Sequence, residues 1–485
     1  DFESAIEKCH AAFMGWRHES HEARAKIIKQ IGEGLRSKKS ELSKLMTNEM
    51  GKQLKQGEQE IDLCAAICDW TAENGPENLK TEERELPNGG KGRVAYSPIG
   101  VIYGIQPWNF PAYQVVRYAI ANLMAGNGVL LKHAENVTGS GLMLEKIFRD
   151  AGLPENLFTV LRISHDQSDK VIEHKLVRGV TLTGSASAGK IIAKKAGEAL
   201  KKTVLELGSN DAYIVLEDAD LEKAVKQCVM GRVYNNGETC VAAKRFIVVD
   251  AIYDKFRDAF VKAMKDVDYG DPLNNEGKIG PMAREDLRDD LHEQVEKSVA
   301  NGAKILCGGE KPSQDGWWYP ATVLDEVKPG QPAYDDELFG PVASLIRAKD
   351  ADDAMRIAND SRFGLGGGIF SENKEKAIKE ARPYFEEAMK FAGPLGVMPL
   401  TPEQNASVVN KGQTPGVALP TLEEAVEAGS WLCGTAESVV EHFKGIEEKY
   451  PGVERVNIGA VMGMPLEVFK DQLSIVAEEV MPAFS

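Results

Sequence analysis

The stretch VIYGIQPWNFPAYQVVRYAIANLMAGNGVLLK, residues 101–132, decides the fold class. It opens with the short apolar run 101–105, continues through a segment with helical spacing at 113–124, and ends in a second apolar run at 128–132. The same alternation then runs on through another helix-like segment to Val160. Short apolar runs that alternate with helices are typical of βαβ units. We therefore predict an α/β protein built on a parallel sheet.

The pattern differs on the N-terminal side and resumes further along the chain. From about residue 3 to residue 74 the apolar spacing is helical, which predicts a helical region. The polar stretch 75–100 contains several Pro and Gly residues and predicts a turn-rich hairpin. A second series of alternating strands and helices is expected from residue 211 to residue 370.

Composition limits the classes of protein to consider. With 485 residues, 43% of them hydrophobic, the chain can bury more than one core, and about three domains are expected. A formal net charge of -16 argues against nucleic acid and anionic membranes as partners. No stretch approaches the ~18–20 unbroken apolar residues of a membrane span, and the N-terminus shows no signal peptide.

The seven cysteines are odd in number and widely scattered. Cys64 and Cys68 lie four residues apart in a helix-like segment without a second ligand pair nearby, so we expect small apolar core residues rather than a metal site. Unpaired cysteines of this kind indicate a reducing compartment, most simply the cytoplasm. No metal site is predicted.

Residues 235–244, NNGETCVAAK, place one cysteine in a polar, glycine-containing loop directly ahead of the β-like run 245–249. A cysteine in such a loop is expected to be accessible, and a thiolate is the strongest nucleophile among ordinary side chains. Cys240 is therefore the candidate nucleophile. The alternative is an inert core cysteine, which is the common role of an isolated cysteine.

Two further polar side chains stand beside predicted strand ends. Asn109 lies in the segment PWNFP, residues 107–111, and Glu206 lies in LELG, residues 205–208. An amide can stabilise an oxyanion, and a carboxylate can act as a general base. With Cys240 they supply the three parts that acyl-transfer chemistry at a carbonyl needs. The alternatives are an asparagine in a Pro-flanked turn and a surface glutamate at a strand end.

Taken in order, these motifs resemble the aldehyde dehydrogenase superfamily over about residues 1–381. The resemblance implies a Rossmann-like NAD-binding domain at 1–205, with an arm at about 75–98 that reaches a neighbouring subunit, and an α/β catalytic domain at 206–381. A homo-oligomer is expected from this arm.

The resemblance also implies the catalytic roles. Cys240 attacks the aldehyde, Asn109 and the Cys240 backbone N–H stabilise the oxyanion, and Glu206 activates the water that hydrolyses the thioester. The family usually has Gln where this chain has Glu238. By the like-charge argument, a carboxylate there is expected to raise the pKa of the Cys240 thiol if its side chain points inward.

The usual Gly-x-Gly-x-x-Gly fingerprint of dinucleotide binding is absent after the first strand. The resemblance instead implies that Gly184 and Ser185, ahead of a helix from about Ala188, face the cofactor pyrophosphate. It places Lys132 and Glu135 at the adenosine ribose. A carboxylate there repels a 2′-phosphate, which favours NAD over NADP. The alternative for Lys132 and Glu135 is a pair of solvated loop charges.

Four more cofactor contacts follow from the resemblance. Glu337 and Phe339 match residues that grip the nicotinamide ribose and ring, and Ile105 and Trp108 match residues that lie against the cofactor.

Arg117 follows Asn109 by eight residues, about two helical turns, so the two lie on roughly the same helix face. In the family this position lines the substrate tunnel, and an arginine there resembles the succinate-semialdehyde dehydrogenases. A guanidinium can clamp a carboxylate through two hydrogen bonds. Tyr113 is the second predicted substrate residue. The alternative for Arg117 is an exposed helix arginine.

The dehydrogenase pattern stops near Ala381. Residues 382–485 resemble instead the C-terminal part of luciferase-like flavin monooxygenases, most clearly at 429–440, GSWLCGTAESVV. This resemblance predicts a βαβα segment that corresponds to about two of the eight units of a (β/α)₈ barrel, too few to close one. The chain therefore reads as a chimera. Loss of the family's closing segment, with its intersubunit strand, is expected to weaken the homo-oligomer.

These expectations converge on the NAD-dependent oxidation of an aldehyde to a carboxylate through a cysteine thioester, most simply of a semialdehyde such as succinate semialdehyde. The alternative is a catalytically impaired NAD-binding or scaffold protein, because the closing segment is replaced. A third hypothesis is flavin-dependent monooxygenase activity from the C-terminal segment, which predicts a yellow preparation.

Overall fold

The structure is a computed structural model that describes residues 1–85, 90–275, 277–372 and 444. The chain forms two compact units. Of the described residues, unit 1 comprises Asp1–Gly208, Val267–Asp290 and Lys311–Pro320, and unit 2 comprises Ser209–Asp266, Leu291–Glu310 and 321–372. The predicted luciferase-like segment, 382–485, lies outside the described residues apart from Lys444.

Unit 1 begins with helices, as the spacing predicts. They are α1 (Phe2–Trp16), α2 (His21–Ser37), α3 (Lys39–Met50) and α4 (Leu54–Asn78). Asp1 and Ser20 cap the first two, each accepting a hydrogen bond from a backbone N–H of the first turn. Cys64 and Cys68 of α4 are fully buried, which confirms their assignment to the core.

The predicted hairpin forms, but it begins later than expected. Strands β1 (Glu82–Glu85) and β2 (Lys91–Val94) pair antiparallel, whereas α4 continues through Pro76 to Asn78. Gly75 explains the longer helix, because it is buried and a Cβ there would lie 2.7 Å from Met124 Cγ. Close packing against α5 (Tyr113–Met124) therefore outweighs the turn signal of this Gly-Pro pair.

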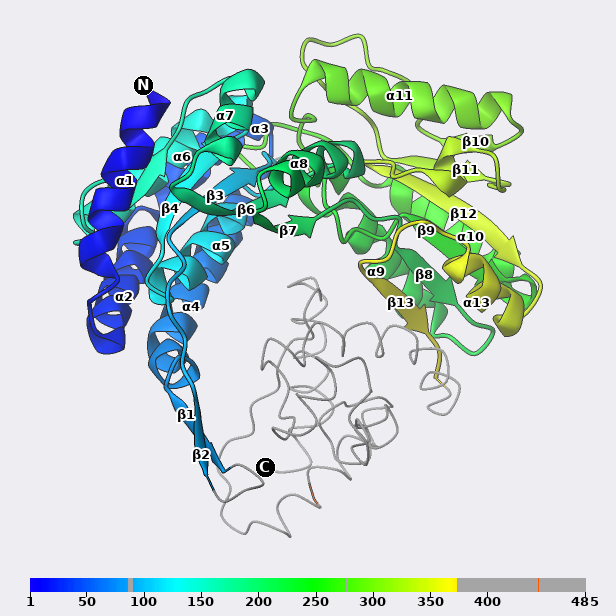
Figure 1. The fold of residues 1–485 in the computed structure, drawn as a ribbon. Coiled ribbons are helices and arrows are strands. Elements are labelled where there is room, and N and C mark those ends of the chain that lie inside the picture. Colours follow the sequence, from blue (N-terminus) through cyan, green and yellow to red (C-terminus); the bar gives the residue numbers. More distant parts are fainter. Residues whose placement is uncertain (86–89, 276, 373–443, 445–485) are drawn as a thin grey trace. The chain divides into compact units, whose positions relative to one another are not determined.

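Five parallel strands form the sheet of unit 1 in the order β5-β4-β3-β6-β7 (Figure 1). The strands are β3 (Val101–Gln106), β4 (Gly128–His133), β5 (Phe158–Val160), β6 (Val177–Thr183) and β7 (Lys202–Glu206). The connections contain α5, η1 (Glu135–Val137), α6 (Thr138–Asp150), α7 (His165–Glu173) and α8 (Ala186–Glu198). The chain order reverses between β3 and β6, and open sheets of this kind bind ligands at the carboxyl ends of the strands beside such a point.

Apolar cores cover both faces of this sheet, as strand β4 illustrates. Val129 and Leu131 belong to one hydrophobic cluster with side chains from α2, α4, α5 and α6. Leu130, between them, belongs to a second cluster with side chains from α1, α7 and α8. Because successive strand residues point to opposite faces, an unbroken apolar strand needs burial on both sides.

The sheet of unit 2 has the order β10-β11-β12-β9-β8-β13, and β10–β11 is its antiparallel pair. Its strands are β8 (Ala212–Val215), β9 (Arg245–Val249), β10 (Lys304–Cys307), β11 (Thr322–Asp325), β12 (Val342–Ala348) and β13 (Gly367–Phe370). Its helices are α9 (Leu221–Val233), η2 (Tyr234–Gly237), α10 (Asp250–Lys265), α12 (Pro332–Asp335) and α13 (Ala351–Asn359), and α11 (Glu285–Ala300) has residues in both units. The predicted α/β class is confirmed.

Gly104 of β3 provides a test of this packing. A Cβ at Gly104 would lie 2.2 Å from Cζ of the buried Tyr118 ring, so we expect Gly104→Ala to lower the free energy of unfolding by about 1–3 kcal/mol. Gly197→Ala is the matched control. Gly197 is exposed on helix α8, and a Cβ there would meet no atom within 4 Å. Alanine at this position should raise the free energy of unfolding by about 0.5–1 kcal/mol. Equal denaturation midpoints for Gly104→Ala and the parent protein would contradict the packing described.

Candidate active site

The loop that carries Cys240 lies between α9 and β9 of unit 2. Its first residues adopt left-handed backbone conformations, with φ of 53° at Asn235, 59° at Asn236 and 75° at Gly237. Asparagine tolerates this region, and glycine adopts it without strain. A Cβ on Gly237 would lie 2.4 Å from the carbonyl carbon of Gly340, so this tight turn also requires a residue without a side chain.

This loop is polar in composition and yet mostly buried. Asn235, Asn236 and Glu238 are each at most 1% exposed, whereas Cys240 is partly exposed. Burying polar groups costs free energy unless they form hydrogen bonds. Arg232 of α9, itself fully buried, meets part of this need by donating from Nη2 to the Gly237 carbonyl at 2.6 Å.

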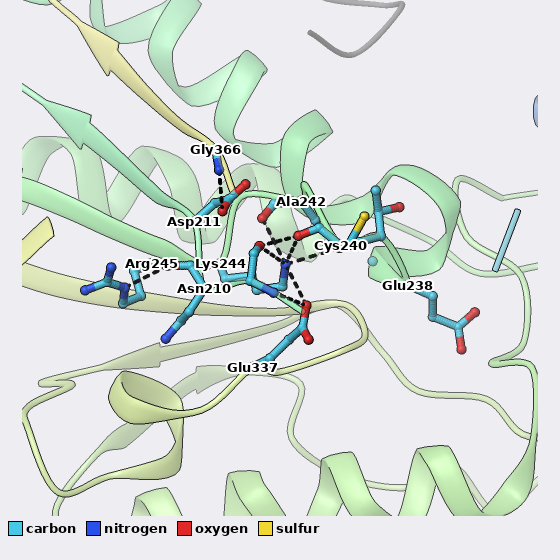
Figure 2. A network of polar contacts seen from close by, with 12 residues as sticks. Asn210, Asp211, Glu238, Cys240, Ala242, Lys244, Arg245, Glu337 and Gly366 are labelled. Atoms are coloured by element: carbon cyan, nitrogen blue, oxygen red, sulfur yellow. Dashed lines mark hydrogen bonds and ion pairs between the residues drawn. The ribbon is translucent and has the colours of Figure 1, made fainter. Parts of the chain in front are cut away.

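A lysine that the sequence did not single out lies at the centre of this loop. Lys244 Nζ donates to the carbonyl oxygens of Cys240 at 2.6 Å and Thr239 at 3.2 Å (Figure 2). It also forms an ion pair with Glu337 at 3.2 Å. The one signal available in the sequence was a charged residue four positions after the candidate nucleophile, immediately before an apolar strand.

The electrostatic surroundings of Cys240 act in opposite directions. Burial raises the pKa of its thiol, the Lys244 ammonium lowers that pKa, and the carboxylates of Glu337 and Asp211 raise it. The effect expected of Glu238 depended on its side chain pointing inward, and Figure 2 shows this side chain directed away from the Cys240 sulfur. The carboxylates that oppose ionisation of this thiol are therefore distant in sequence rather than two residues away.

Glu337 and Phe339 lie between α12 and β12. The Oε1 atom of Glu337 accepts from the Ser209 backbone N–H at 3.1 Å as well as from Lys244. The structure thus brings Glu337 and the Cys240 loop together within unit 2. Phe339, two residues further on, is partly exposed.

In unit 1, the predicted cofactor residues gather at the carboxyl ends of the parallel strands. Ile105 and Trp108 lie at and just after the end of β3, and Lys132 is the penultimate residue of β4. Gly184 and Ser185 follow β6 directly. These ends adjoin the point where the strand order reverses, so the structure places the five residues where such sheets bind ligands.

The chemistry of this edge suits an anionic, ribose-containing cofactor. Ser185 caps α8 and is exposed, and its Oγ accepts from the Ala188 N–H at 3.2 Å, so the N–H groups of the first helical turn face the ligand-binding edge. Burial lowers the pKa of Lys132, and the Glu135 carboxylate opposes that shift. A cation, a carboxylate and a helix N-terminus are the groups that a dinucleotide's ribose and pyrophosphate need.

The predicted substrate residues meet the predicted base. Arg117 Nη1 lies 3.6 Å from Glu206 Oε1, and Arg117 Nη2 donates to Thr183 Oγ1 at 3.4 Å. The guanidinium also lies 5.8 Å from the centre of the Tyr113 ring. Both charged side chains are 36% exposed, so Arg117 is neither a fully solvated helix residue nor a buried one. Asn109 is buried in the same unit, in the turn that follows β3.

The described residues contain neither a metal-binding cluster nor a membrane-spanning helix. In the part of the chain that the structure describes, no three or more His, Cys, Asp or Glu side chains gather as a metal site would require. Nor does any helix of that part have the length and apolar character needed to cross a membrane.

Comparison with known proteins decides the family. The model of the aldehyde dehydrogenase family matches residues 1–385. The chain belongs to the aldehyde dehydrogenase family. It is thus an NAD(P)-dependent aldehyde dehydrogenase by class, as its sequence indicated, and the matched region ends close to the predicted junction near Ala381.

Three proteins show which members of the family the chain is similar to. The chain is 46% identical over 381 residues to succinate semialdehyde dehydrogenase of Escherichia coli (strain K12), named for NAD(P)+, with 79% of this chain and 82% of that protein covered. It is 41% identical over 376 residues to succinate-semialdehyde dehydrogenase of Deinococcus radiodurans, named for NADP(+), with coverages of 78% and 79%. The structure of succinic semialdehyde dehydrogenase from Streptococcus pyogenes in complex with NADP+ matches with a TM-score of 0.76 and 37% identity, covering 78% of this chain and 84% of that one.

The pKa of Cys240 has a direct consequence for its reactivity. Because its thiol pKa lies above the ordinary value, its thiolate fraction near neutral pH is small and grows about tenfold per pH unit. We therefore expect iodoacetamide labelling of Cys240 in the cofactor-free protein to accelerate by about that factor per unit between about pH 6 and pH 8. Mass spectrometry of the labelled peptides measures this rate.

The folded protein contains its own comparison for that measurement. Four other cysteines are buried and should resist labelling over the same range: Cys9, Cys64, Cys68 and Cys228. A Cys240 labelling rate that does not change with pH would mean that the thiol is already ionised, contrary to the raised pKa.

Proposed function

We propose that this chain oxidises a semialdehyde, most simply succinate semialdehyde, to the corresponding carboxylate with NAD(P)+ through a thioester on Cys240. The observation that carries the proposal is the group around Arg117, where a partly exposed guanidinium lies beside both Glu206 and the Tyr113 ring. A cation in that place suits a substrate with a second, negatively charged end. The names of the relatives support the same substrate.

The first half of the reaction is addition followed by oxidation. The Cys240 thiolate forms a bond to the aldehyde carbon, and the carbonyl π electrons move to oxygen. The Asn109 amide and the Cys240 backbone N–H stabilise that oxyanion; losing one such donor typically costs about 2.7–4 kcal/mol of transition-state stabilisation. Bound NAD(P)+ would supply the hydride acceptor that this oxidation needs, and loss of the hydride from the adduct carbon would leave a thioester on Cys240. Glu337, Phe339, Ile105 and Trp108 are proposed to hold the nicotinamide half.

The second half is hydrolysis. Glu206 takes a proton from water as the oxygen attacks the thioester carbon, and the C–S bond breaks to give the carboxylic acid and the Cys240 thiolate. The acid loses its proton to solvent and leaves as the carboxylate, and Glu206 returns its proton to solvent. In the structure the Glu206 carboxylate pairs with Arg117. We propose that the distal carboxylate of the substrate takes over Arg117, which releases Glu206 to act as the base.

The adenosine half rests on Lys132, Glu135, Gly184 and Ser185. Glu135 is expected to repel a 2′-phosphate, which favours NAD, whereas several relatives are named for NADP(+). We keep NAD as the proposed preference, and a comparison of kcat/KM for the two cofactors tests it.

The remaining proposals concern the whole chain. We propose a cytoplasmic protein, with 1–205 as the cofactor domain, 206–381 as the catalytic domain and a luciferase-like segment at 382–485 in place of the closing segment. A homo-oligomer weakened by that replacement follows. The alternative function, an NAD-binding or scaffold protein without turnover, is the second outcome of the experiment below.

Purified protein with succinate semialdehyde and NAD+ should form NADH, and Cys240→Ala should abolish it, because the variant lacks the proposed nucleophile. Absorbance of the reduced cofactor measures the rate. Absence of turnover in the parent protein, with cofactor binding intact, would reject the dehydrogenase and favour the scaffold alternative.

Replacement of the proposed carboxylate clamp tests substrate choice. We expect Arg117→Met to lower kcat/KM for succinate semialdehyde by about 10–100-fold, the worth of about 1.5–3 kcal/mol for a charged hydrogen bond, with little loss for a short aliphatic aldehyde. Arg149→Met, which removes an exposed arginine from α6, is the control and should change neither value. Equal losses for both aldehydes would refute a clamp.

A further inference from the structure

Lys244 is a buried cation that the proposed reaction does not use. Lys244 is 1% exposed, although lysine side chains are almost never buried without partners. Taking an ammonium out of water costs several kcal/mol unless hydrogen bonds and opposite charges replace its hydration. The groups that replace it therefore show what the lysine holds together.

Most of these groups are backbone carbonyls of the nucleophile loop. Besides those of Cys240 and Thr239, Nζ lies 3.4 Å from the Ala242 carbonyl oxygen. It also lies 3.1 Å from Ser209 Oγ, and the Ser209 hydroxyl in turn donates to the Cys240 carbonyl. One ammonium thus gathers the backbone on both sides of Cys240.

The contact with Thr239 determines the direction of a second group. The Thr239 carbonyl and the Cys240 N–H belong to the same planar, trans peptide unit, so they point in opposite directions. Lys244 binds the oxygen side of that unit, which turns the Cys240 N–H away from the lysine. That N–H is the proposed backbone donor to the oxyanion.

The other partner of Lys244 is a cofactor residue. Lys244 and the Ser209 N–H both meet Oε1 of Glu337, at 3.2 and 3.1 Å. The carboxylate is thus held at this oxygen by a cation and by a backbone donor. Glu337 is the residue proposed to grip the nicotinamide ribose.

Two carboxylates and a second cation act on the Lys244 ammonium. Burial lowers the pKa of Lys244, and the carboxylates of Glu337 and Asp211 oppose that shift, while Arg232 adds to it. Asp211 itself is held by the Gly366 N–H at 3.1 Å (Figure 2). Two buried cations thus face two carboxylates, so removing one member leaves an uncompensated charge.

We propose that Lys244 is a positioning residue whose buried ammonium locks the Cys240 loop and Glu337 into one arrangement, so that the nucleophile, its oxyanion N–H and the nicotinamide-ribose carboxylate are set together. The inference rests on the proposed function. It predicts that the pKa of the Cys240 thiol and the affinity for the cofactor both depend on Lys244, which contacts neither the substrate nor the reacting atoms.

The test measures two properties of the protein without aldehyde. They are the pH profile of Cys240 labelling by iodoacetamide in the cofactor-free protein and the dissociation constants of NAD+ and NADP+ by titration calorimetry. The variants are Lys244→Met, which removes the charge, Lys244→Arg, which keeps it, and Glu337→Gln. Arg245→Gln is the control, because the neighbouring buried Arg245 binds the carbonyls of Asn210, Ile357 and Ala358 and none of those in the Cys240 loop.

Opposite shifts are the signature of the proposal. Lys244→Met should raise the apparent pKa of Cys240 by about one unit, which slows labelling near neutral pH about tenfold, and Glu337→Gln should lower that pKa. Both should weaken binding of the preferred cofactor about tenfold or more, and their effects should not add in the double variant. Lys244→Arg should recover part of each property. Arg245→Gln should reduce thermal stability without moving either readout.

Several outcomes would overturn the proposal. A folded Lys244→Met variant with the labelling profile and cofactor affinity of the parent would do so, and so would equal shifts in Arg245→Gln. If Lys244→Met does not fold, Glu337→Gln and Lys244→Arg provide the test. An unchanged pKa of Cys240 in Glu337→Gln would reject the network. So would parent values of both the Cys240 labelling profile and the cofactor affinity in Glu337→Gln and Lys244→Arg. Failure of the parent protein to oxidise aldehydes would reject the proposed function alone, because neither readout uses an aldehyde.

Discussion

All five strands of the unit 1 sheet run in the same direction, and most of the proposed chemistry of that unit depends on this constraint. Parallel strands end at one edge, so residues from separate parts of the chain meet there without any local sequence relationship. Trp108, Lys132, Ser185 and Glu206 each lie at or just beyond the carboxyl end of a different strand. The apolar clusters on both faces of the sheet keep those ends in register.

In unit 2 the main constraint is the burial of the polar loop that carries Cys240. Left-handed turns at Asn235 and Asn236 fold the backbone back on itself, and the carbonyls that this exposes need donors inside the protein. Arg232 supplies one from the preceding helix, and Lys244 supplies others from the position just before the following strand. The same two cations require carboxylates nearby, and Asp211 and Glu337 therefore also act on the thiol of Cys240. Loop structure and thiol reactivity are therefore linked through one set of charges.

Sequence reasoning succeeded where the signal was local. The predicted helix at 113–124 agrees with α5 at both ends, because its apolar residues pack on β3 and β4 with a regular period. It failed at the end of α4, where contact with Met124 outweighed a Gly-Pro turn signal. Lys244 was missed for a related reason, since a lysine before an apolar strand is ordinarily solvated. Only the fold brings Glu337, ninety-three positions further along, to its ammonium.

The ion pair between Arg117 and Glu206 has a kinetic meaning. If the resting enzyme keeps its hydrolytic base bound to the residue that recognises the substrate, then an aldehyde without a distal charge still reaches the thioester but leaves the base occupied. Part of the selectivity is then exercised after the bond to sulfur has formed, in addition to the part that Arg117 contributes to substrate binding. A poor substrate would then give a single burst of reduced cofactor, followed by a long-lived acyl-enzyme. It would be poor because its acyl-enzyme is hydrolysed slowly, and not because the aldehyde binds weakly.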